Sequence, residues 1–243
     1  MMQDWAGWLL ILFSFSIVLI WKHLRSDTKV VHAIWFCTVM HHVVVFLNVY
    51  IPDASTFQNA GLRLASLPEP ELLSDFSNGA INYIHFLGFF YRAFFSASHL
   101  FGKELSVLAF VLSCVVLVKL VYILDLRRFR VGIVLFFGLL PSKVIFGSVT
   151  LREPWQALFF LLFVYSAIRL QNRLGILNVS LLLMSSFCMS LLHHGLAKYA
   201  VYLFLISIFW CVFGSKRSVR WVRNVRFLFA GLLVAFTIIL IQK

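Results

Sequence analysis

Charged residues are scarce in this chain, and acidic residues are the scarcest of them. Only 12% of its 243 residues are charged, whereas 62% are hydrophobic; soluble domains hold roughly a quarter charged residues. This composition excludes a soluble enzyme or binding domain. The repeated apolar runs are long enough to cross a hydrocarbon core of roughly 30 Å. They predict an all-α polytopic membrane protein, folded as a single transmembrane domain over residues 1–243.

Other absences narrow the class of protein further. The chain has four cysteines, and no two of them have the spacing of a metal or redox site, so we interpret them as small core residues. It contains no glycine-rich phosphate loop, no zinc motif and no nucleophile elbow. No basic segment precedes the first apolar run, which argues against a cleaved signal peptide.

The apolar runs predict about eight transmembrane helices, and the connectors between them predict the orientation. With the N-terminus outside, 13 lysines and arginines lie in inner connectors and 6 in outer ones, which follows the positive-inside rule. This placement accounts for the net charge of +12 without nucleic acid as a partner. The expected spans are Trp5–Trp21, Val30–Ile51, Leu105–Leu124, Val131–Val149, Trp155–Leu170, Leu177–Leu192, Ala197–Phe213 and Phe227–Ile241.

The longest departure from this pattern is segment 51–103, which we expect to be an outer loop that carries an amphipathic helix. Between Ala80 and Phe101, polar residues recur at three- and four-residue steps, which predicts a helix with a narrow polar stripe. If this helix crossed the membrane, the later basic connectors would lie outside, so we expect it to lie along the outer face. The stripe consists of Asn82, His85, Arg92, Ser96 and His99, and we expect its histidines and arginine to face the protein.

The predicted topology gathers the residues suited to chemistry on the outer side of the membrane. These residues are Asp53, Arg63, His85, Arg92, Lys143, Arg152, Glu153, His194 and Lys198. Structural alternatives remain open for several of them. Asp53 is suited to cap a helix start, and the pair before Pro154 is suited to the first turn of another helix. Lys143 lies within the fourth expected span, where its side chain either faces a cavity or extends to the membrane surface.

Several motifs follow one another in a recognisable order. Asp53 is followed by Phe57 and Ala60, and then by the aromatic segment NYIHFLGFFYRAF. The later segment LLPSKVIFGSVTLREP carries Pro141, Ser142, Ser148, Arg152 and Glu153. In this order the motifs resemble those of GT-C-fold membrane glycosyltransferases that use polyprenyl-phosphate sugars as donors. The resemblance covers roughly residues 30–170.

The resemblance implies a GT-C-like fold and an enzyme of cell-envelope polysaccharide biosynthesis in the bacterial inner (plasma) membrane. The enzyme would transfer a sugar from the polyprenyl-phosphate donor to a glycan, lipid or protein acceptor on the outer face. Asp53 would be the catalytic base, which implies inversion, and Glu153 a second catalytic carboxylate. A divalent metal held by these two residues is compatible with the chemistry but not required by it. The residues that would bind the substrates are Arg152, Lys143, His194, Lys198, Arg63, Arg92 and His85.

Departures from the family pattern leave other functions open. The acidic loop follows the second expected span rather than the first, Asp53 has no second acid beside it, and the chain is short. The first alternative is therefore a non-catalytic membrane subunit of a glycan-assembly or envelope complex, bound to partner membrane proteins. The second alternative is a transporter.

The predicted orientation has a direct test. We expect cysteines introduced as Ser74→Cys and Ser218→Cys to be labelled from opposite sides of the membrane, because one lies in the outer loop and the other in the last basic connector. The measurement is reaction with a membrane-impermeant thiol reagent, applied to intact cells and to inverted vesicles. Labelling of both positions from the same side would contradict the orientation.

Overall fold

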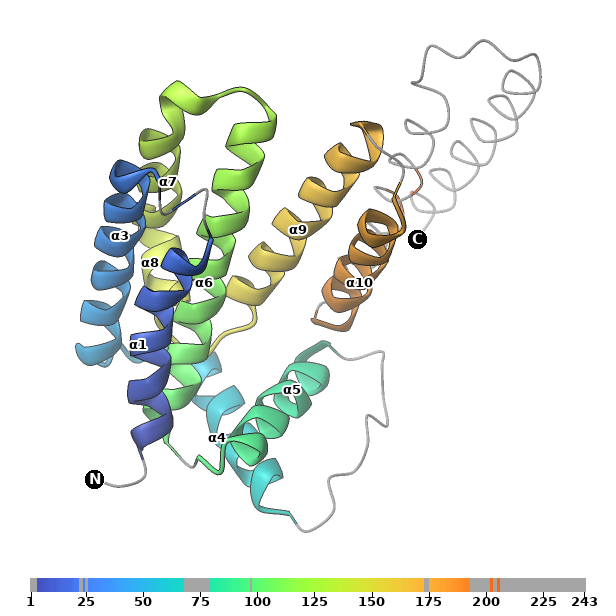
Figure 1. Cartoon of the computed structure of the whole chain (residues 1–243). Coiled ribbons are helices and arrows are strands. Elements are labelled where there is room, and N and C mark those ends of the chain that lie inside the picture. The colour runs from blue at the N-terminus through green and yellow to red at the C-terminus, as the bar shows by residue number, and fades with distance from the viewer. Residues whose placement is uncertain are drawn as a thin grey trace. The chain divides into compact units, whose positions relative to one another are not determined.

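The computed structural model describes residues 4–21, 24, 26–67, 79–96, 98–172, 175–192, 202 and 205 (Figure 1). These residues form helices, and no β-strand occurs among them, which confirms the predicted all-α class. The chain divides into two compact units, Met1–Leu161 and Leu162–Lys243.

The first unit is built around α6 (His99–Ile123), a helix of 25 residues that is buried along most of its length. Its start is fixed by Ser98, whose hydroxyl accepts hydrogen bonds from the backbone N–H groups of Leu100 and Phe101. A serine in this position satisfies donors that the first helical turn leaves without partners. The helices that contact α6 are α1 (Trp5–Ile20), α3 (Thr28–Phe46), α5 (Gly79–Ala93), α7 (Arg130–Leu139) and α8 (Pro141–Gly147).

Within the described residues, two helices are long and apolar enough to cross a membrane, α3 and α6. A third span results if the bent pair α7–α8 counts as one. The described helices are thus compatible with membrane association, but they do not support the predicted count of eight spans. α1 and α10 (Ile176–Leu192) are apolar but only 16 and 17 residues long. The expected spans at Ala197–Phe213 and Phe227–Ile241 lie outside the described residues.

The predicted span Val131–Val149 is broken rather than continuous. α7 ends at Leu139, α8 begins at Pro141, and the two axes meet at 62°. Proline lacks a backbone N–H and disfavours a helical conformation in the residue before it. Leu140 accordingly adopts φ −55° and ψ 125°, outside the helical region. This run does not form one continuous helix, because Pro141 starts a new helix instead of continuing the old one; the bent pair can still count as one span.

Segment 51–103 holds two packed helices, α4 (Pro52–Ser66) and α5, instead of one long amphipathic helix. Glycines allow the close approach, since a Cβ on Gly61 would lie 2.9 Å from Leu87 and a Cβ on Gly88 would lie 2.9 Å from Leu64. α5 ends at Ala93, and Phe95 follows with a φ of 47°. The expected helix to Phe101 was therefore too long, because the chain turns and enters α6.

The buried side of α5 holds only one residue of the predicted polar stripe, Asn82, beside the aromatic residues. Tyr83, Leu87 and Tyr91 are buried at successive four-residue steps, whereas Arg92 is exposed and His85 is half-buried. His99 is exposed and begins α6, so it does not share a helix with the other stripe residues. The expectation that these residues face the protein was thus wrong for Arg92 and His99, whereas His85 is half-buried.

A buried polar cluster joins α4 and α5 to α6 at Gly102. A Cβ on Gly102 would lie 2.2 Å from the Tyr91 hydroxyl and 3.1 Å from Thr150 Oγ1. Gln58 donates from Nε2 to the backbone oxygen of His99 at 2.6 Å. Burial raises the pKa of Tyr91 to about 12, so its hydroxyl keeps its proton. Only glycine leaves room for these polar groups beside α6.

In the second unit, the described part of the core is a cluster between α9 (Glu153–Asn172) and α10. Phe163, Ala167 and Leu170 lie on one side of α9 and pack with Leu182 of α10. Their spacing of three and four residues is the usual period of a buried helix face.

The glycine at position 102 yields a stability prediction. We expect Gly102→Ala to lower the free energy of unfolding by about 1–3 kcal/mol, because the added methyl group overlaps the Tyr91 hydroxyl. Gly102→Ala combined with Tyr91→Phe should recover part of this loss, because the overlapping oxygen is gone. The measurement is thermal unfolding in detergent.

Gly132 provides the control, because a Cβ there has no neighbour within 4 Å. Gly132→Ala should be neutral or stabilising, since alanine favours a helix by up to about 1 kcal/mol over glycine. Equal losses from the two glycine substitutions would contradict the packing at Gly102.

Candidate functional site

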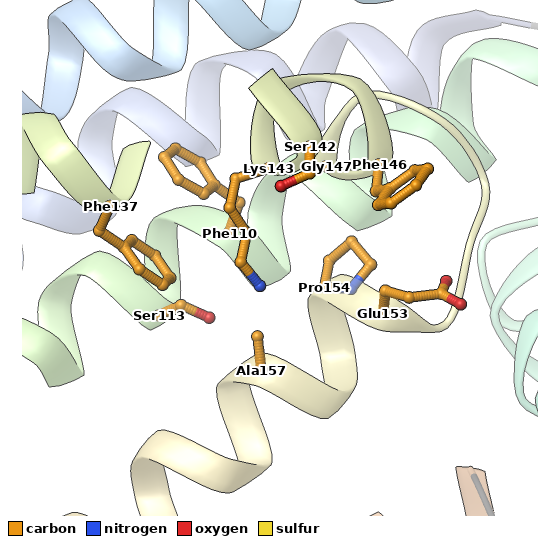
Figure 2. A pocket seen from close by; sticks show the side chains of 10 residues that line it. All are labelled: Phe110, Ser113, Phe137, Ser142, Lys143, Phe146, Gly147, Glu153, Pro154 and Ala157. Atoms are coloured by element: carbon orange, nitrogen blue, oxygen red, sulfur yellow. The ribbon is translucent and has the colours of Figure 1, made fainter. Parts of the chain in front are cut away.

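A cavity of about 250 Å³ opens where the bend between α7 and α8 faces α6 and the start of α9 (Figure 2). Its walls are mostly apolar and include three phenylalanines. The polar side chains that reach it are a lysine, a glutamate and two serines. The lining consists of Phe110, Ser113, Phe137, Ser142, Lys143, Phe146, Gly147, Glu153, Pro154 and Ala157.

Lys143, on α8, provides the positive charge of this cavity. In Figure 2 its ammonium group points into the space between Ser113 and Pro154. The ammonium nitrogen lies 5.6 Å from the centre of the Phe137 ring, within the range of a cation–π contact. No ion pair of Lys143 is present among the described residues. Its charge is therefore available to an anionic ligand.

Glu153, the first residue of α9, lines the same cavity, but its carboxylate is turned away from Lys143 (Figure 2). Its Oε2 atom is buried and has no hydrogen-bond partner among the described residues. A buried oxygen in this state costs free energy unless a ligand or water satisfies it. The alternative interpretation of this segment as a helix start is confirmed for the local structure, because α9 begins here.

Asp53 lies in the first turn of α4 and is exposed. It is not the cap of this helix, because the cap position is Ile51 and Pro52 is the first helical residue. Ala54, beside Asp53, belongs to a hydrophobic cluster with Val149 and Leu151. The first turn of α4 therefore packs against the segment that leads into Arg152 and Glu153.

Tyr83 fixes that segment from α5. Its hydroxyl donates a hydrogen bond of 2.8 Å to the backbone oxygen of Leu151, the residue before Arg152. Burial raises the pKa of Tyr83 well above its ordinary value, so the hydroxyl stays protonated and remains a donor. The Tyr83 ring also meets Phe57 of α4 edge-on, with ring centres 5.3 Å apart. α4, α5 and the segment before α9 thus form one packed group.

Aromatic contacts connect α5 to the start of α9. The ring of Phe86 lies 4.8 Å from that of Trp155, and the ring of Phe90 lies 6.3 Å from it. Such pairs add roughly 0.5–1.5 kcal/mol beyond the burial of their area. They hold α5 beside the residues that follow Glu153.

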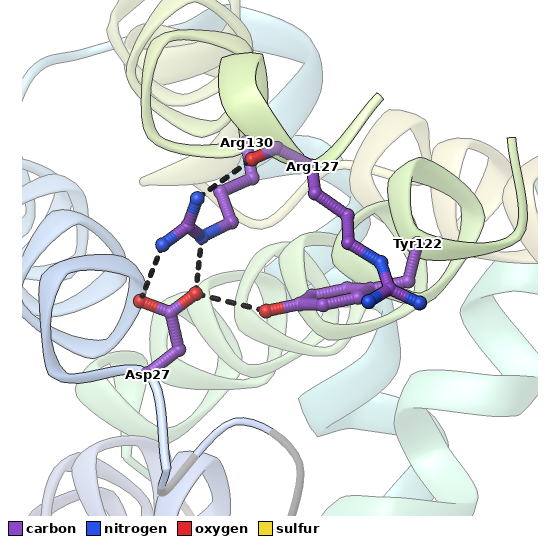
Figure 3. Close-up of polar contacts among 4 residues, drawn as sticks. All are labelled: Asp27, Tyr122, Arg127 and Arg130. Carbon is purple, nitrogen blue, oxygen red and sulfur yellow. Dashed lines mark hydrogen bonds and ion pairs between the residues drawn. The ribbon is translucent and has the colours of Figure 1, made fainter. Parts of the chain in front are cut away.

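Most of the described acidic residues have polar partners. Asp27 accepts hydrogen bonds from Arg130 Nη2 at 3.3 Å and from the Tyr122 hydroxyl at 2.8 Å, and it forms a close ion pair with Arg130 Nε (Figure 3). Burial raises the pKa of the Asp27 carboxyl, but the hydrogen bonds and the charge of Arg130 outweigh it and lower the pKa below its ordinary value. This carboxylate is committed to joining α3 to α6 and α7.

Three further acids also have hydrogen-bond or ion-pair partners. Glu104 pairs with His42 at 3.2 Å, Asp4 accepts a hydrogen bond from the Ser98 hydroxyl, and Asp125 lies 4.0 Å from an arginine in an exposed connector. Among the described residues, this leaves Asp53 and Glu153 as the acids whose side chains have no hydrogen bond or ion pair. Both lie at the segment around Leu151.

The structure brings together part of the predicted site. Lys143 and Glu153 line one cavity, and the neighbours of Asp53 and Arg152 share a hydrophobic cluster. The predicted residues Arg63, His85 and Arg92 lie on α4 and α5 and do not line the cavity. His194 and Lys198 lie outside the described residues.

Neither a metal cluster nor a matching relative adds to this geometry. In the described part of the chain, no group of three or more His, Cys, Asp and Glu residues is arranged to hold a metal ion. The chain matches no protein-family model, no curated protein and no solved structure. The arguments that follow therefore depend on the residues themselves.

The cavity can be tested by filling it. We expect Ala157→Leu to leave the melting temperature nearly unchanged, because the added side-chain atoms enter the open space beside Lys143. The matched substitution Ala109→Leu, in the buried core of α6, should cost about 1–3 kcal/mol through overpacking. Thermal unfolding of the two variants in detergent gives the comparison, and equal losses would show that position 157 is packed rather than open.

Proposed function

We propose that this protein is a membrane glycosyltransferase that transfers a sugar from a polyprenyl-phosphate donor to an acceptor hydroxyl. The observation that carries the proposal is the position of the two acids that, in the described part of the chain, have no side-chain partner. Asp53 and Glu153 come from distant parts of the chain, and both lie beside the segment around Leu151. Lys143 supplies a cation in the same region. A carboxylate and a cation that line one cavity, with a second carboxylate on a turn that packs against the segment before Glu153, suit the transfer of a group from a phosphate.

The cavity suits the donor in both charge and polarity. Its ammonium group and the hydroxyls of Ser113 and Ser142 are donors for phosphate oxygens. Its phenylalanine walls are suited to the first isoprene units of the lipid. Arg152 follows Leu151 directly, and a guanidinium binds phosphate through two parallel hydrogen bonds. These groups would bind the phosphate of the donor, next to the bond between the sugar and the phosphate oxygen that breaks in the reaction.

The reaction needs one base and a stabilised leaving group. Asp53 accepts the proton of the acceptor hydroxyl as the acceptor oxygen bonds to the anomeric carbon. The bond from that carbon to the phosphate oxygen breaks, and the polyprenyl phosphate leaves with the additional negative charge. Arg152 and Lys143 stabilise that charge. A single displacement of this kind inverts the anomeric configuration.

The proposal includes the finer arrangement expected from the sequence. The protein would have about eight spans in a GT-C-like fold in the bacterial plasma membrane, with its N-terminus and its site on the outer side. α4 and α5 would lie along the outer leaflet. Their amphipathic sequences and the acidic loop between them support this placement.

The catalytic assignment predicts the effect of two substitutions. We expect Asp53→Asn to keep the fold and donor binding but to reduce turnover about 10²- to 10⁴-fold, the usual contribution of a positioned acid or base. Arg152→Lys should weaken donor binding, because a point charge cannot replace a planar fork. The measurement is transfer of labelled sugar from a polyprenyl-phosphate donor in reconstituted membranes, with variants matched for expression.

Two matched variants provide the controls. Asp125→Asn and Arg128→Lys change exposed residues of the connector after α6, so activity should stay at the native level. Full activity in Asp53→Asn would remove the proposed mechanism. No transfer by the native chain, together with stable co-purification of another membrane protein, would favour the non-catalytic subunit. Uptake of a solute by vesicles that hold the native chain would favour the transporter.

A further inference from the structure

His41 contacts three residues that line the cavity, although it does not line the cavity itself. The residue lies on α3 and is 0% exposed. Its ring stacks on Phe110, with centres 3.7 Å apart and planes tilted by 18°. Its Nε2 atom lies 3.1 Å from the backbone oxygen of Lys143. A Cβ on Gly147 would lie 2.8 Å from the same ring, so glycine is required there.

The contact with Lys143 stabilises α8, a short helix. α8 has only seven residues and follows the break at Pro141. A helix this short lacks most of the internal hydrogen bonds that stabilise a long one. Support must therefore come from outside α8, and the His41 ring reaches its backbone at the residue whose side chain enters the cavity.

The hydrogen-bonding capacity of the ring fits this support. His41 Nδ1 lies 2.8 Å from the backbone oxygen of Cys37, one turn earlier on α3. Both oxygens can only accept, so a neutral imidazole, which carries one N–H, donates to one of them. The tautomer with its proton on Nε2 donates it to Lys143 and leaves Nδ1 without a proton beside Cys37. The neighbouring His42 differs, because it pairs with Glu104 and packs beside Phe15. The two adjacent histidines thus act on different parts of the structure.

We propose that His41 is a positioning residue, which holds α8 so that the Lys143 ammonium group lies in the cavity and binds the phosphate of the donor. This assignment rests on the proposed glycosyltransferase function. The His41 ring does not touch substrate. It acts through the backbone oxygen of Lys143 and through the Phe110 wall on which it stacks.

Three substitutions separate the hydrogen bond from the packing. His41→Gln places an amide N–H near the position of Nε2 and preserves the bond to Lys143. His41→Asn reaches only the position of Nδ1, next to Cys37, and loses that bond. His41→Phe keeps the stacking on Phe110 and loses both polar contacts. The matched control is His32→Phe, because His32 lies on the same helix and is exposed.

The first measurement follows position 143 directly and does not depend on activity. Lys143→Cys is combined with each variant, and the rate at which a charged methanethiosulfonate reagent modifies position 143 is measured by mass spectrometry. We expect His41→Asn and His41→Phe to raise this rate roughly fivefold, since a lost hydrogen bond of about 1 kcal/mol frees α8 to that extent. His41→Gln and His32→Phe should leave the rate unchanged. Equal rates in all variants would overturn the proposal.

The second measurement is the kinetic effect on the donor. Without other changes at position 143, His41→Asn and His41→Phe should raise the KM for the polyprenyl-phosphate donor more than they lower kcat, and His41→Gln should restore it. A labelling change without a change in KM would overturn the role in donor binding. If the native chain transfers no sugar, the proposed function fails, while the labelling rates still decide whether His41 positions α8.

Discussion

The backbone break at Pro141 is the constraint on which the site depends. In a membrane, backbone groups freed by a helix break need partners inside the protein. Just after the break, the N–H groups of Lys143 and Val144 donate to the backbone oxygen of Leu140 at 2.8 and 3.0 Å. Further along α8, His41 contacts the Lys143 oxygen, and the Ser148 hydroxyl donates to the Val144 oxygen at 2.6 Å. α8 departs from the line of α7 by 62° and is held by these contacts.

The same break creates both the cavity and its charge. A straight helix through this region would continue along the line of α7, whereas the bent α8 faces α6 and the start of α9 around an open space. A lysine inside a span is costly unless it faces a partner or a cavity, and the bend gives Lys143 a cavity. The positions of the proline and of the lysine two residues later are thus parts of one arrangement.

The sequence predicted what depends on local chemistry and missed what depends on distant contacts. The helical class and the helix start at Glu153 followed from apolar periodicity and from the proline. The break at Pro141 had a signal in the proline itself, but the length of the apolar run outweighed it. His41 could not be assigned, because its partner lies 102 residues away. The burial of Tyr83 could have been predicted, since Tyr83, Leu87 and Tyr91 repeat at four-residue steps. The prediction instead assigned the polar residues of the same helix to the buried side.

The contacts of the acids distinguish the carboxylates that stabilise the fold from those proposed to take part in the reaction. Asp27 forms an ion pair with Arg130, and Glu104 pairs with His42; both pairs lie at α6, and removing one partner would leave the other group without its contact. Asp27 and Glu104 thus contribute to stability, and the groups that donate to them use the carboxylate lone pairs that a reaction would need. Asp53 and the buried Glu153 Oε2 keep those lone pairs available in the described part of the chain. Among the described residues, Glu153 lines the same cavity as Lys143, and Asp53 lies on a turn that packs against the segment before Glu153; the proposed group transfer depends on this arrangement.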